Sequence, residues 1–359
     1  NSAHRHPIFT SAVNLLSSFK PTQVENDHGS ACFAGKTECC FQGDERMPGP
    51  GELLLRMKAV SVNYRDLLML RGQYNPRQPL PLIPCSDGVG EVVAVGPGVE
   101  RFTVGERVVS TFFQDWIAGP PTPERVASTL GGPLDGVLAE MVTLGVDGVV
   151  RVPQHLTDHA AAALPCAGLT AWNALVHHGH LRAGQTVAIL GTGGVATFCV
   201  QFARMLGARV VVLSSSDEKL AYVQKLGADA VINYLAQPNW GKAIAEMTQG
   251  RGVDVVVELG GGGSLEQSLR AVAVGGTIVL IGVLAGAQAA LNITPAIMRQ
   301  VRIQGMLVGH RDSFEEMNRA IELHQLEPVI DQVFSFNEAP MAFEHLQHRQ
   351  HVGKVAIRF

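Results

Sequence analysis

A glycine-rich turn between a buried strand and an apolar helix constrains this chain more than any other feature. The strand TVAIL ends at Leu190 and is followed directly by GTGGVA, a G-x-G-x-x-A pattern. Gly191 permits the tight turn, Gly193 lets the backbone approach a pyrophosphate, and Ala196 allows the helix to pack closely on the strand. The helix N-terminus offers unpaired N–H groups to the anion. The turn therefore predicts dinucleotide binding, with a ligand-free βα turn as the alternative.

Short buried strands alternate with amphipathic helices around this turn. The strands are expected over Thr186–Leu190, Arg209–Leu213, Ala230–Ile232, Val253–Glu258 and Thr277–Ile281, and the helices over Ala196–Leu206, Asp217–Leu226 and Leu265–Ala273. Repeated βαβ units imply a parallel sheet with helices on both faces. We expect an α/β fold with a doubly wound parallel sheet of the Rossmann type over residues 161–310.

The flanking residues read as a second, β-rich domain. Before the alternation, strands are expected over Glu52–Val62, Gly88–Val95, Val104–Val109, Val137–Val142 and Val149–Val152. After it, we expect a helix over Ser313–His324, a strand over Val329–Phe334, a helix over Ala339–His348 and a strand over Lys354–Phe359. We infer that the C-terminal tail rejoins the first domain. That domain is then discontinuous and covers residues 1–160 and 311–359.

Composition narrows the class of partner. Charged residues make up 17% of the 359 residues, against about 25% in a typical soluble domain. No apolar run approaches the ~20 residues needed to span a bilayer, and no cluster of Lys and Arg suggests nucleic acid. We therefore expect a soluble protein with a small-molecule partner. Six irregularly spaced cysteines read as reduced thiols, which favours the cytoplasm.

The N-terminal stretch Asn1–Arg46 is the least readable part of the chain. Asn1–Lys20 contains no acidic residue, which is weakly typical of a transit peptide. A mitochondrial location is therefore the alternative to the cytoplasm.

Hydroxyl groups and a lysine stand where an NAD-binding fold carries an acidic residue. About twenty residues after the glycine turn the sequence reads LSSSDEKL, which places Ser214, Ser215 and Lys219 at this point. A carboxylate would repel a ribose 2′-phosphate, whereas hydroxyls and an ammonium bind one. The sequence thus predicts NADP(H) rather than NAD(H). Ser216 with Asp217 after it is also good helix-capping chemistry, whichever cofactor binds.

From about Pro48 to its end, the chain resembles the medium-chain dehydrogenase/reductase superfamily, in particular its zinc-independent quinone-oxidoreductase-like and zinc-type alcohol dehydrogenase-like branch. The similarity is carried by the Gly191 turn, the SSSDEKL segment, Ser61–Tyr74, Gly88–Val109, Leu164–Ala174, Val253–Gly286 and Gly353–Phe359. The resemblance implies a GroES-like catalytic domain beside the Rossmann domain. It also implies a homodimer, which relatives often form through the sheets of the cofactor domains.

Two of the three catalytic zinc ligands of the superfamily are missing. The resemblance places the ligand positions at Asn63, Ser86 and Cys166, and residues 112–136 lack the cysteines of the structural-zinc loop. One thiol cannot make the three-ligand site that a catalytic zinc requires. We therefore expect no metal, and we interpret Cys166 as a small buried residue rather than a nucleophile.

Without a Lewis acid, the best-suited chemistry is hydride delivery to a small hydrophobic enone, enal or quinone. The resemblance places Tyr74 where some relatives carry a tyrosine proton donor, and a phenol is protonated at neutral pH. Water as the donor, with Tyr74 packed at the cleft wall, is the alternative. Asn63 is a candidate to bind the substrate carbonyl or the cofactor ribose, and Asp66 to order the local loop.

The resemblance also assigns the remaining cofactor contacts. These are Thr170, Ile281, Val283 and Val308 at the nicotinamide end, Tyr234 at the adenosine end, and Gly191, Gly193, Gly194 and Val195 at the pyrophosphate. Phe113 and Trp116 could stack on a flat acceptor or anchor the core.

Three other functions remain open. The protein could oxidise an activated alcohol such as an allylic one, or act as a tailoring enzyme on one elaborate metabolite. It could also be a catalytically idle dinucleotide-binding protein.

Overall fold

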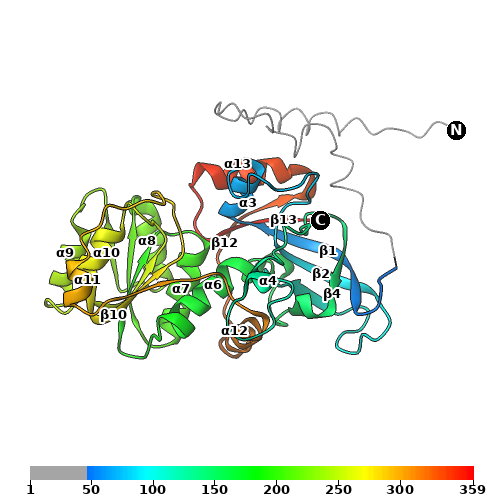
Figure 1. Ribbon diagram of the computed structural model, residues 1–359, viewed down its shortest axis with the longest axis horizontal. Helices are drawn as coiled ribbons and strands as arrows, with labels where there is room; N and C mark the ends of the chain where they lie inside the picture. Colours follow the sequence, from blue (N-terminus) through cyan, green and yellow to red (C-terminus); the bar gives the residue numbers. More distant parts are fainter. Residues whose placement is uncertain (1–46) are drawn as a thin grey trace. The chain divides into compact units, whose positions relative to one another are not determined.

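The computed structural model describes residues 47–359, which form two compact units (Figure 1). Of these residues, unit 1 comprises 47–166, 310–322 and 330–359, and unit 2 comprises 167–309 and 323–329. The expectations for Asn1–Arg46, including Cys32, Cys39 and Cys40, lie outside the described part. The cysteines within it, Cys85, Cys166 and Cys199, are free thiols. No helix of residues 47–359 is long and apolar enough to cross a membrane.

Unit 2 contains a six-stranded sheet in the order β11-β10-β9-β6-β7-β8, and every adjacent pair is parallel. The strands are β6 (Thr186–Leu190), β7 (Arg209–Ser214), β8 (Ala230–Asn233), β9 (Val253–Glu258), β10 (Val272–Leu280) and β11 (Arg302–Gly305). Numbered along the chain from β6, the spatial order is 3-2-1-4-5-6, the order of dinucleotide-binding folds. The predicted doubly wound sheet is confirmed.

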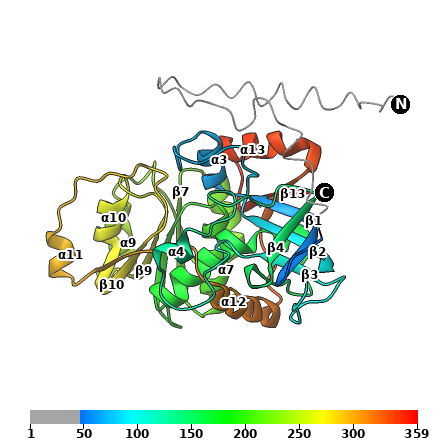
Figure 2. The ribbon, with the colours of Figure 1, turned by 45° about the vertical axis from the view of Figure 1, so that its right-hand side comes forward.

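Helices cover both faces of this sheet (Figures 1 and 2). Those of unit 2 include α6 (Leu169–Trp172), α7 (Gly194–Met205), α8 (Asp217–Leu226), α9 (Trp240–Met247), α10 (Leu265–Ala271) and α11 (Thr294–Met298). Trp240 of α9 and Leu269 of α10 pack with Ala188 of β6, while α7 contacts the same strand. Val187 and Ala188 point to opposite faces, and both are buried. Strands that helices cover on both faces consist almost wholly of apolar residues, which explains the low proportion of charged residues in the chain.

Unit 1 is built on a seven-stranded sheet in the order β12-β13-β1-β2-β3-β5, with β4 also paired to β1. The strands are β1 (Glu52–Val62), β2 (Asp87–Val95), β3 (Arg107–Ser110), β4 (Met141–Gly145), β5 (Val149–Arg151), β12 (Ile330–Ser335) and β13 (Lys354–Arg358). β13 runs antiparallel to β1, with Val62 opposite Val355. The last strand of the chain therefore completes the sheet that β1 begins.

The strand expected over Val137–Val142 was placed too early, because β4 begins only at Met141. Val137 is fully buried, and its N–H donates to the carbonyl of Cys85, in the loop before β2. Gly136 lies so close to this loop that an added Cβ would be 2.1 Å from the Cys85 carbonyl oxygen. This apolar segment packs as an irregular loop, which its composition alone did not indicate.

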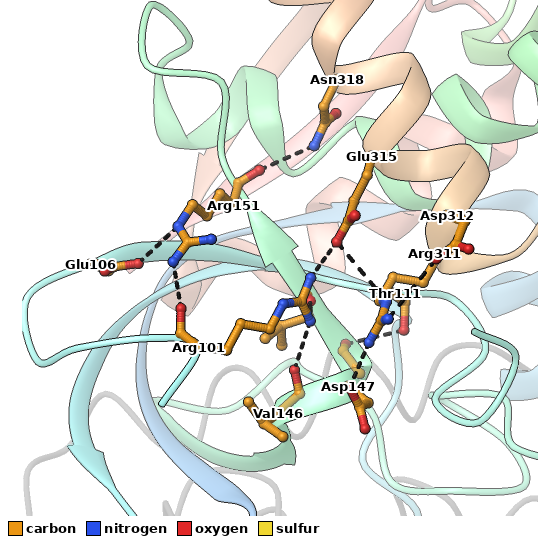
Figure 3. Close-up of polar contacts among 12 residues, drawn as sticks. Arg101, Glu106, Thr111, Val146, Asp147, Arg151, Arg311, Asp312, Glu315 and Asn318 are labelled. Carbon is orange, nitrogen blue, oxygen red and sulfur yellow. Dashed lines mark hydrogen bonds and ion pairs between the residues drawn. The ribbon is translucent and has the colours of Figure 1, made fainter. Parts of the chain in front are cut away.

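The main helices of unit 1 are α3 (Tyr64–Leu70), α4 (Pro123–Val126), α5 (Asp158–Ala161), α12 (Arg311–His324) and α13 (Ala339–His348). Charged side chains hold α12 against the loops that connect the strands of the sheet (Figure 3). Glu315 pairs with Arg101, whose Nη1 also donates to the Val146 carbonyl at 3.0 Å. Arg311 lies 2.5 Å from Asp147. These contacts hold residues 310–322 in unit 1, although the rest of α12 belongs to unit 2.

Candidate functional site

A cluster of buried polar side chains lies in unit 1, where the end of β1 meets the starts of β2 and β13. Its members are Asn63, Asp66, Ser86, Asp87, Cys166 and Lys354. Cys166 is half-buried as a whole residue, but its sulfur is enclosed. The pairing of β13 with β1 brings Lys354 beside Asn63, although 291 residues separate them. The fold thus gathers all three positions assigned to metal ligands.

Lys354 is the positively charged residue of the cluster, and its role was not predicted from the sequence. Its side chain is 4% exposed, and Nζ donates to Asn63 Oδ1 at 2.6 Å and to the Val62 carbonyl at 2.7 Å. Lysine is almost never this buried unless its charge is compensated. Here the compensating charges are those of Asp66 and Asp87; burial raises the pKa of both carboxyls, and the Lys354 ammonium offsets part of that rise. The signal in the sequence was a lysine within the apolar strand GKVAI.

The two carboxylates are held by hydrogen bonds. Asp87 accepts from the Ser86 hydroxyl at 2.6 Å and from the backbone N–H of Cys166 at 3.1 Å. Asp66 accepts from the backbone N–H of Asn63 at 2.8 Å, which caps α3 and confirms that Asp66 orders this turn. Burial raises the pKa of both, and that of Asp66 reaches about 6 in spite of the positive charge of Arg65.

The cluster does not fit a catalytic zinc ion. The oxygen of Asn63 already accepts from an ammonium, and the Ser86 hydroxyl is bound to Asp87. Burial, and next the charge of Asp87, raise the pKa of the Cys166 thiol, which disfavours the thiolate that binds metal. An ammonium beside the amide oxygen would also repel a dication. Within residues 47–359, no three His, Cys, Asp or Glu side chains are grouped to hold a metal.

The aromatic candidates of unit 1 differ in exposure. Tyr74 follows α3 and is 51% exposed, so its hydroxyl-bearing ring can meet a ligand. Phe113 and Trp116 are 4% and 6% exposed, and their rings pack edge to face. The structure therefore supports core anchoring for these two residues.

The glycine turn of unit 2 lies where the strand order reverses, between β6 and β9. Ligands of such sheets bind in the crevice outside the carboxyl ends of the strands at this point. Gly191 has φ +90°, which favours glycine, and its N–H donates to the Leu213 carbonyl at 2.6 Å. Gly193 caps the twelve-residue α7. The N–H groups of Gly194 and Val195 in its first turn have no partner within the helix.

Two of the residues expected at the adenosine end meet where β7 and β8 end. Ser214 is buried at the end of β7, and the N–H of Tyr234 donates to its carbonyl at 3.1 Å. Ser215 is exposed, and Lys219 lies in the first turn of α8. Ser216 caps that helix by accepting from the Lys219 N–H, so the capping interpretation is confirmed.

Asn173 links the segments that carry two of the residues expected at the nicotinamide end. Its Nδ2 donates to the Leu169 carbonyl at 3.1 Å and to the Val308 carbonyl at 2.9 Å. Val308 is thereby held beside α6, which carries the buried Thr170.

Glu258 organises the loops that carry the other two residues expected at the nicotinamide end, Ile281 and Val283. From the sequence it was predicted only to end a strand. It is fully buried, and its Oε1 accepts from the N–H groups of Gly260 and Gly261 and from the Ser264 hydroxyl, at 2.6–3.0 Å. Its Oε2 accepts from the Ser268 hydroxyl. Its carbonyl accepts from Ile281 at 3.0 Å. Glu258 thus ties the loop after β9 to the loop after β10, which carries Ile281 and Val283.

Comparison with known proteins agrees with this architecture. Residues 49–154 match the alcohol dehydrogenase GroES-like domain, and residues 194–323 match the zinc-binding dehydrogenase family. A zinc-type alcohol dehydrogenase-like protein of Schizosaccharomyces pombe is 41% identical over 86% of this chain and 91% of its own length. The chain belongs to the medium-chain dehydrogenase/reductase superfamily.

Other members of the superfamily differ in their named activities. An acryloyl-coenzyme A reductase of Metallosphaera sedula is 30% identical over 86% of this chain and 93% of its own. A solved structure from Sinorhizobium meliloti, described as an alcohol dehydrogenase, has 44% identity and a TM-score of 0.83, covering 88% and 92% of the two chains.

Two further structures are named with different cofactors. An NAD-dependent alcohol dehydrogenase is 32% identical, with a TM-score of 0.79 over 88% of this chain and 93% of its own. A 2-octenoyl-CoA carboxylase reductase in complex with NADP and 2-octenoyl-CoA is 25% identical, with a TM-score of 0.79 over 87% of this chain and 80% of its own. The protein is therefore an oxidoreductase of a superfamily that binds nicotinamide dinucleotides, and the choice between NAD and NADP is a separate question.

Proposed function

We propose that this protein is a zinc-independent, NADPH-dependent reductase of a small hydrophobic enone, enal or quinone. The observation that carries the proposal is the hydrogen bond from the Lys354 ammonium to Asn63, at a position that binds zinc in relatives. A reduced nicotinamide, when bound, supplies the hydride. A conjugated acceptor takes the resulting negative charge onto its own oxygen and does not need a Lewis acid. The relative named acryloyl-coenzyme A reductase supports an acceptor of this kind.

The chain's own residues have three tasks in this reaction. Thr170, Ile281, Val283 and Val308 orient the nicotinamide end of the cofactor. The amide nitrogen of Asn63 is buried and has no hydrogen-bond partner of normal geometry. It lies near Asp87 and lowers the pKa of the Asp87 carboxyl, which burial raises. It is suited to bind an oxygen of the substrate or of the cofactor ribose. Tyr74 donates the proton, so that one hydride and one proton together saturate the acceptor.

The preference for NADPH rests on Ser214, Ser215 and Tyr234, at or just after the ends of β7 and β8, and on Lys219 in the first turn of α8. Hydroxyls and an ammonium bind a 2′-phosphate through charge-assisted hydrogen bonds. The Asp217 carboxylate lies at the same end but accepts from Asn233 at 2.8 Å. We expect this bond to keep Asp217 from acting as a ribose ligand.

The proposal is tested by following cofactor oxidation with a panel of quinones, enals and cyclic enones. We expect turnover with at least one conjugated acceptor, and NADPH to bind more tightly than NADH. Oxidation of allylic alcohols at a higher kcat/KM than the reverse reaction would favour the dehydrogenase that several relatives' names suggest. Tight NADPH binding without any turnover would favour an idle dinucleotide-binding protein.

We also propose a homodimer formed through the edge strand β11. Among the strands of residues 47–359 this strand pairs only with β10, and an unpaired edge is a template for a second chain. Three apolar side chains of the neighbouring segment are largely exposed, namely Ile293, Ile297 and Met298 at 61%, 66% and 75%. Exposed apolar surface of this kind marks interaction sites.

Replacing both Ile297 and Met298 by lysine should convert the dimer into a monomer, because two charges would enter the buried surface. Light scattering after size-exclusion chromatography measures the change. Leu323→Lys is the matched control, since Leu323 is 79% exposed but lies outside β11 and α11. A dimer mass retained by the double variant, or a monomeric wild type, would contradict this interface.

A further inference from the structure

Arg65 is a buried arginine with no role in the chemistry proposed above. It lies on α3 and is 8% exposed. Its guanidinium carbon lies 4.9 Å from the centre of the Tyr74 ring and 5.0 Å from that of Phe112. Nη1 donates to the Leu130 carbonyl at 2.9 Å, and Nη2 donates to the Gly132 carbonyl at 3.0 Å. One side chain therefore contacts both the loop that carries Tyr74 and residues 112–132.

The surroundings of Arg65 compensate its charge and are specific for a guanidinium. Asp66 Oδ1 lies 3.8 Å from Arg65 Nη1, and the two aromatic rings add cation–π attraction. A planar fork can donate to two carbonyls while its faces contact two rings. The compact ammonium of a lysine cannot do both. The site is thus built for arginine rather than for positive charge alone.

Packed rings make Phe112 a fixed support for this arrangement. The rings of Phe112 and Phe113 are 4.8 Å apart, those of Phe113 and Trp116 5.4 Å, and those of Trp116 and His310 5.7 Å. Tyr74, at the other end of the series, is half exposed on a loop. Such a side chain has several rotamers unless a neighbour restricts it. Arg65, held by the carbonyls and by Phe112, is that neighbour.

We propose that Arg65 is a positioning residue that holds the Tyr74 ring in the orientation required for proton donation. The proposal rests on the reductase function above. After hydride addition to the β-carbon, the Tyr74 O–H bond breaks and its proton forms the new C–H bond at the α-carbon. The phenolate left behind takes a proton from water. The guanidinium over the ring stabilises that negative charge during the transfer.

A double-mutant cycle between Arg65 and Tyr74 tests this proposal. With an accepted enone and saturating NADPH, we expect Tyr74→Phe to lower kcat by about 100-fold and Arg65→Met by about 10-fold. In the Tyr74→Phe background, Arg65→Met should change kcat by less than about 2-fold, because the group that it positions is gone. The dissociation constant for NADPH should stay unchanged throughout.

Equal losses from Arg65→Met in both backgrounds would overturn the proposal, because they indicate a general structural role. Full activity of Arg65→Met or of Tyr74→Phe would overturn it as well. Arg65→Lys keeps the charge and serves if Arg65→Met fails to fold; its kcat should also fall, and wild-type kcat would count against the proposal. Arg71→Met is the matched control, because Arg71 ends the same helix but is exposed and bonds to Gln347 at 2.6 Å. A wild type inert with every acceptor would instead refute the reductase function.

Discussion

Replacing Lys354 by methionine should lower the free energy of unfolding by about 3–5 kcal/mol at pH 7, the usual cost of leaving a buried charge without a compensating one. Methionine keeps the length of the side chain but removes the ammonium that bonds Asn63 Oδ1 and the Val62 carbonyl. Asp66 and Asp87, both fully buried, then lose a compensating positive charge. Urea denaturation followed by circular dichroism measures the change.

The loss caused by Lys354→Met should be smaller at pH 5 than at pH 8. Burial already raises the pKa of Asp66 to about 6 with the lysine present, and removing the lysine raises it further. As the pH falls through this range, Asp66 takes up a proton and no longer carries an uncompensated charge. The folded variant then binds more protons than the unfolded chain, so its stability rises as the pH falls.

Two further variants separate charge from packing at this site. Adding Asp87→Asn to Lys354→Met should restore part of the lost stability, because it removes a buried negative charge. Lys58→Met should cost less than about 1 kcal/mol, because Lys58 pairs with Glu91 on the surface. Equal effects of Lys354→Met and Lys58→Met would show that the buried ammonium has no special role.

Replacing Glu258 by alanine should weaken NADPH binding by at least about 10-fold and destabilise unit 2. The variant leaves the donors of Gly260, Gly261, Ser264 and Ser268 without their shared acceptor, at about 1–3 kcal/mol for each group left unsatisfied. These donors order the loop after β9, which contacts the loop carrying Ile281 and Val283. Fluorescence titration with NADPH and urea denaturation measure the two effects.

Glu258→Gln should retain most of the NADPH affinity. The glutamine oxygen can still accept from Gly260, Gly261 and Ser264, and its amide nitrogen can donate to the Ser268 hydroxyl. Glu246→Ala is a control for loss of a carboxylate, since Glu246 is exposed on α9. If Glu258→Ala binds NADPH as the wild type does, the loop does not depend on this carboxylate.

Local sequence pattern was sufficient to predict much of the fold. The bounds of β6, α8, β9 and α13 agree with the predictions to the residue. Their apolar spacing and their capping residues lie within the elements themselves. The start of β4 was wrong because burial against the loop before β2, rather than alternation, determines how Val137 packs.

The chemistry was only partly predictable, because its partners are distant in sequence. The glycine turn was predictable because its residues are adjacent in the sequence. Lys354 meets Asn63 only because β13 pairs with β1, and Arg65 meets Phe112 only because a loop folds back over α3. No single-sequence pattern encodes these registers, so neither contact was predicted.

Turnover by metal-stripped protein tests the central claim most directly. The protein is dialysed against a chelator, its zinc content is measured by mass spectrometry, and NADPH oxidation with a conjugated acceptor is followed in the same sample. We predict undiminished kcat with far less than one zinc per chain. Activity that disappears on chelation and returns in proportion to added zinc would contradict it.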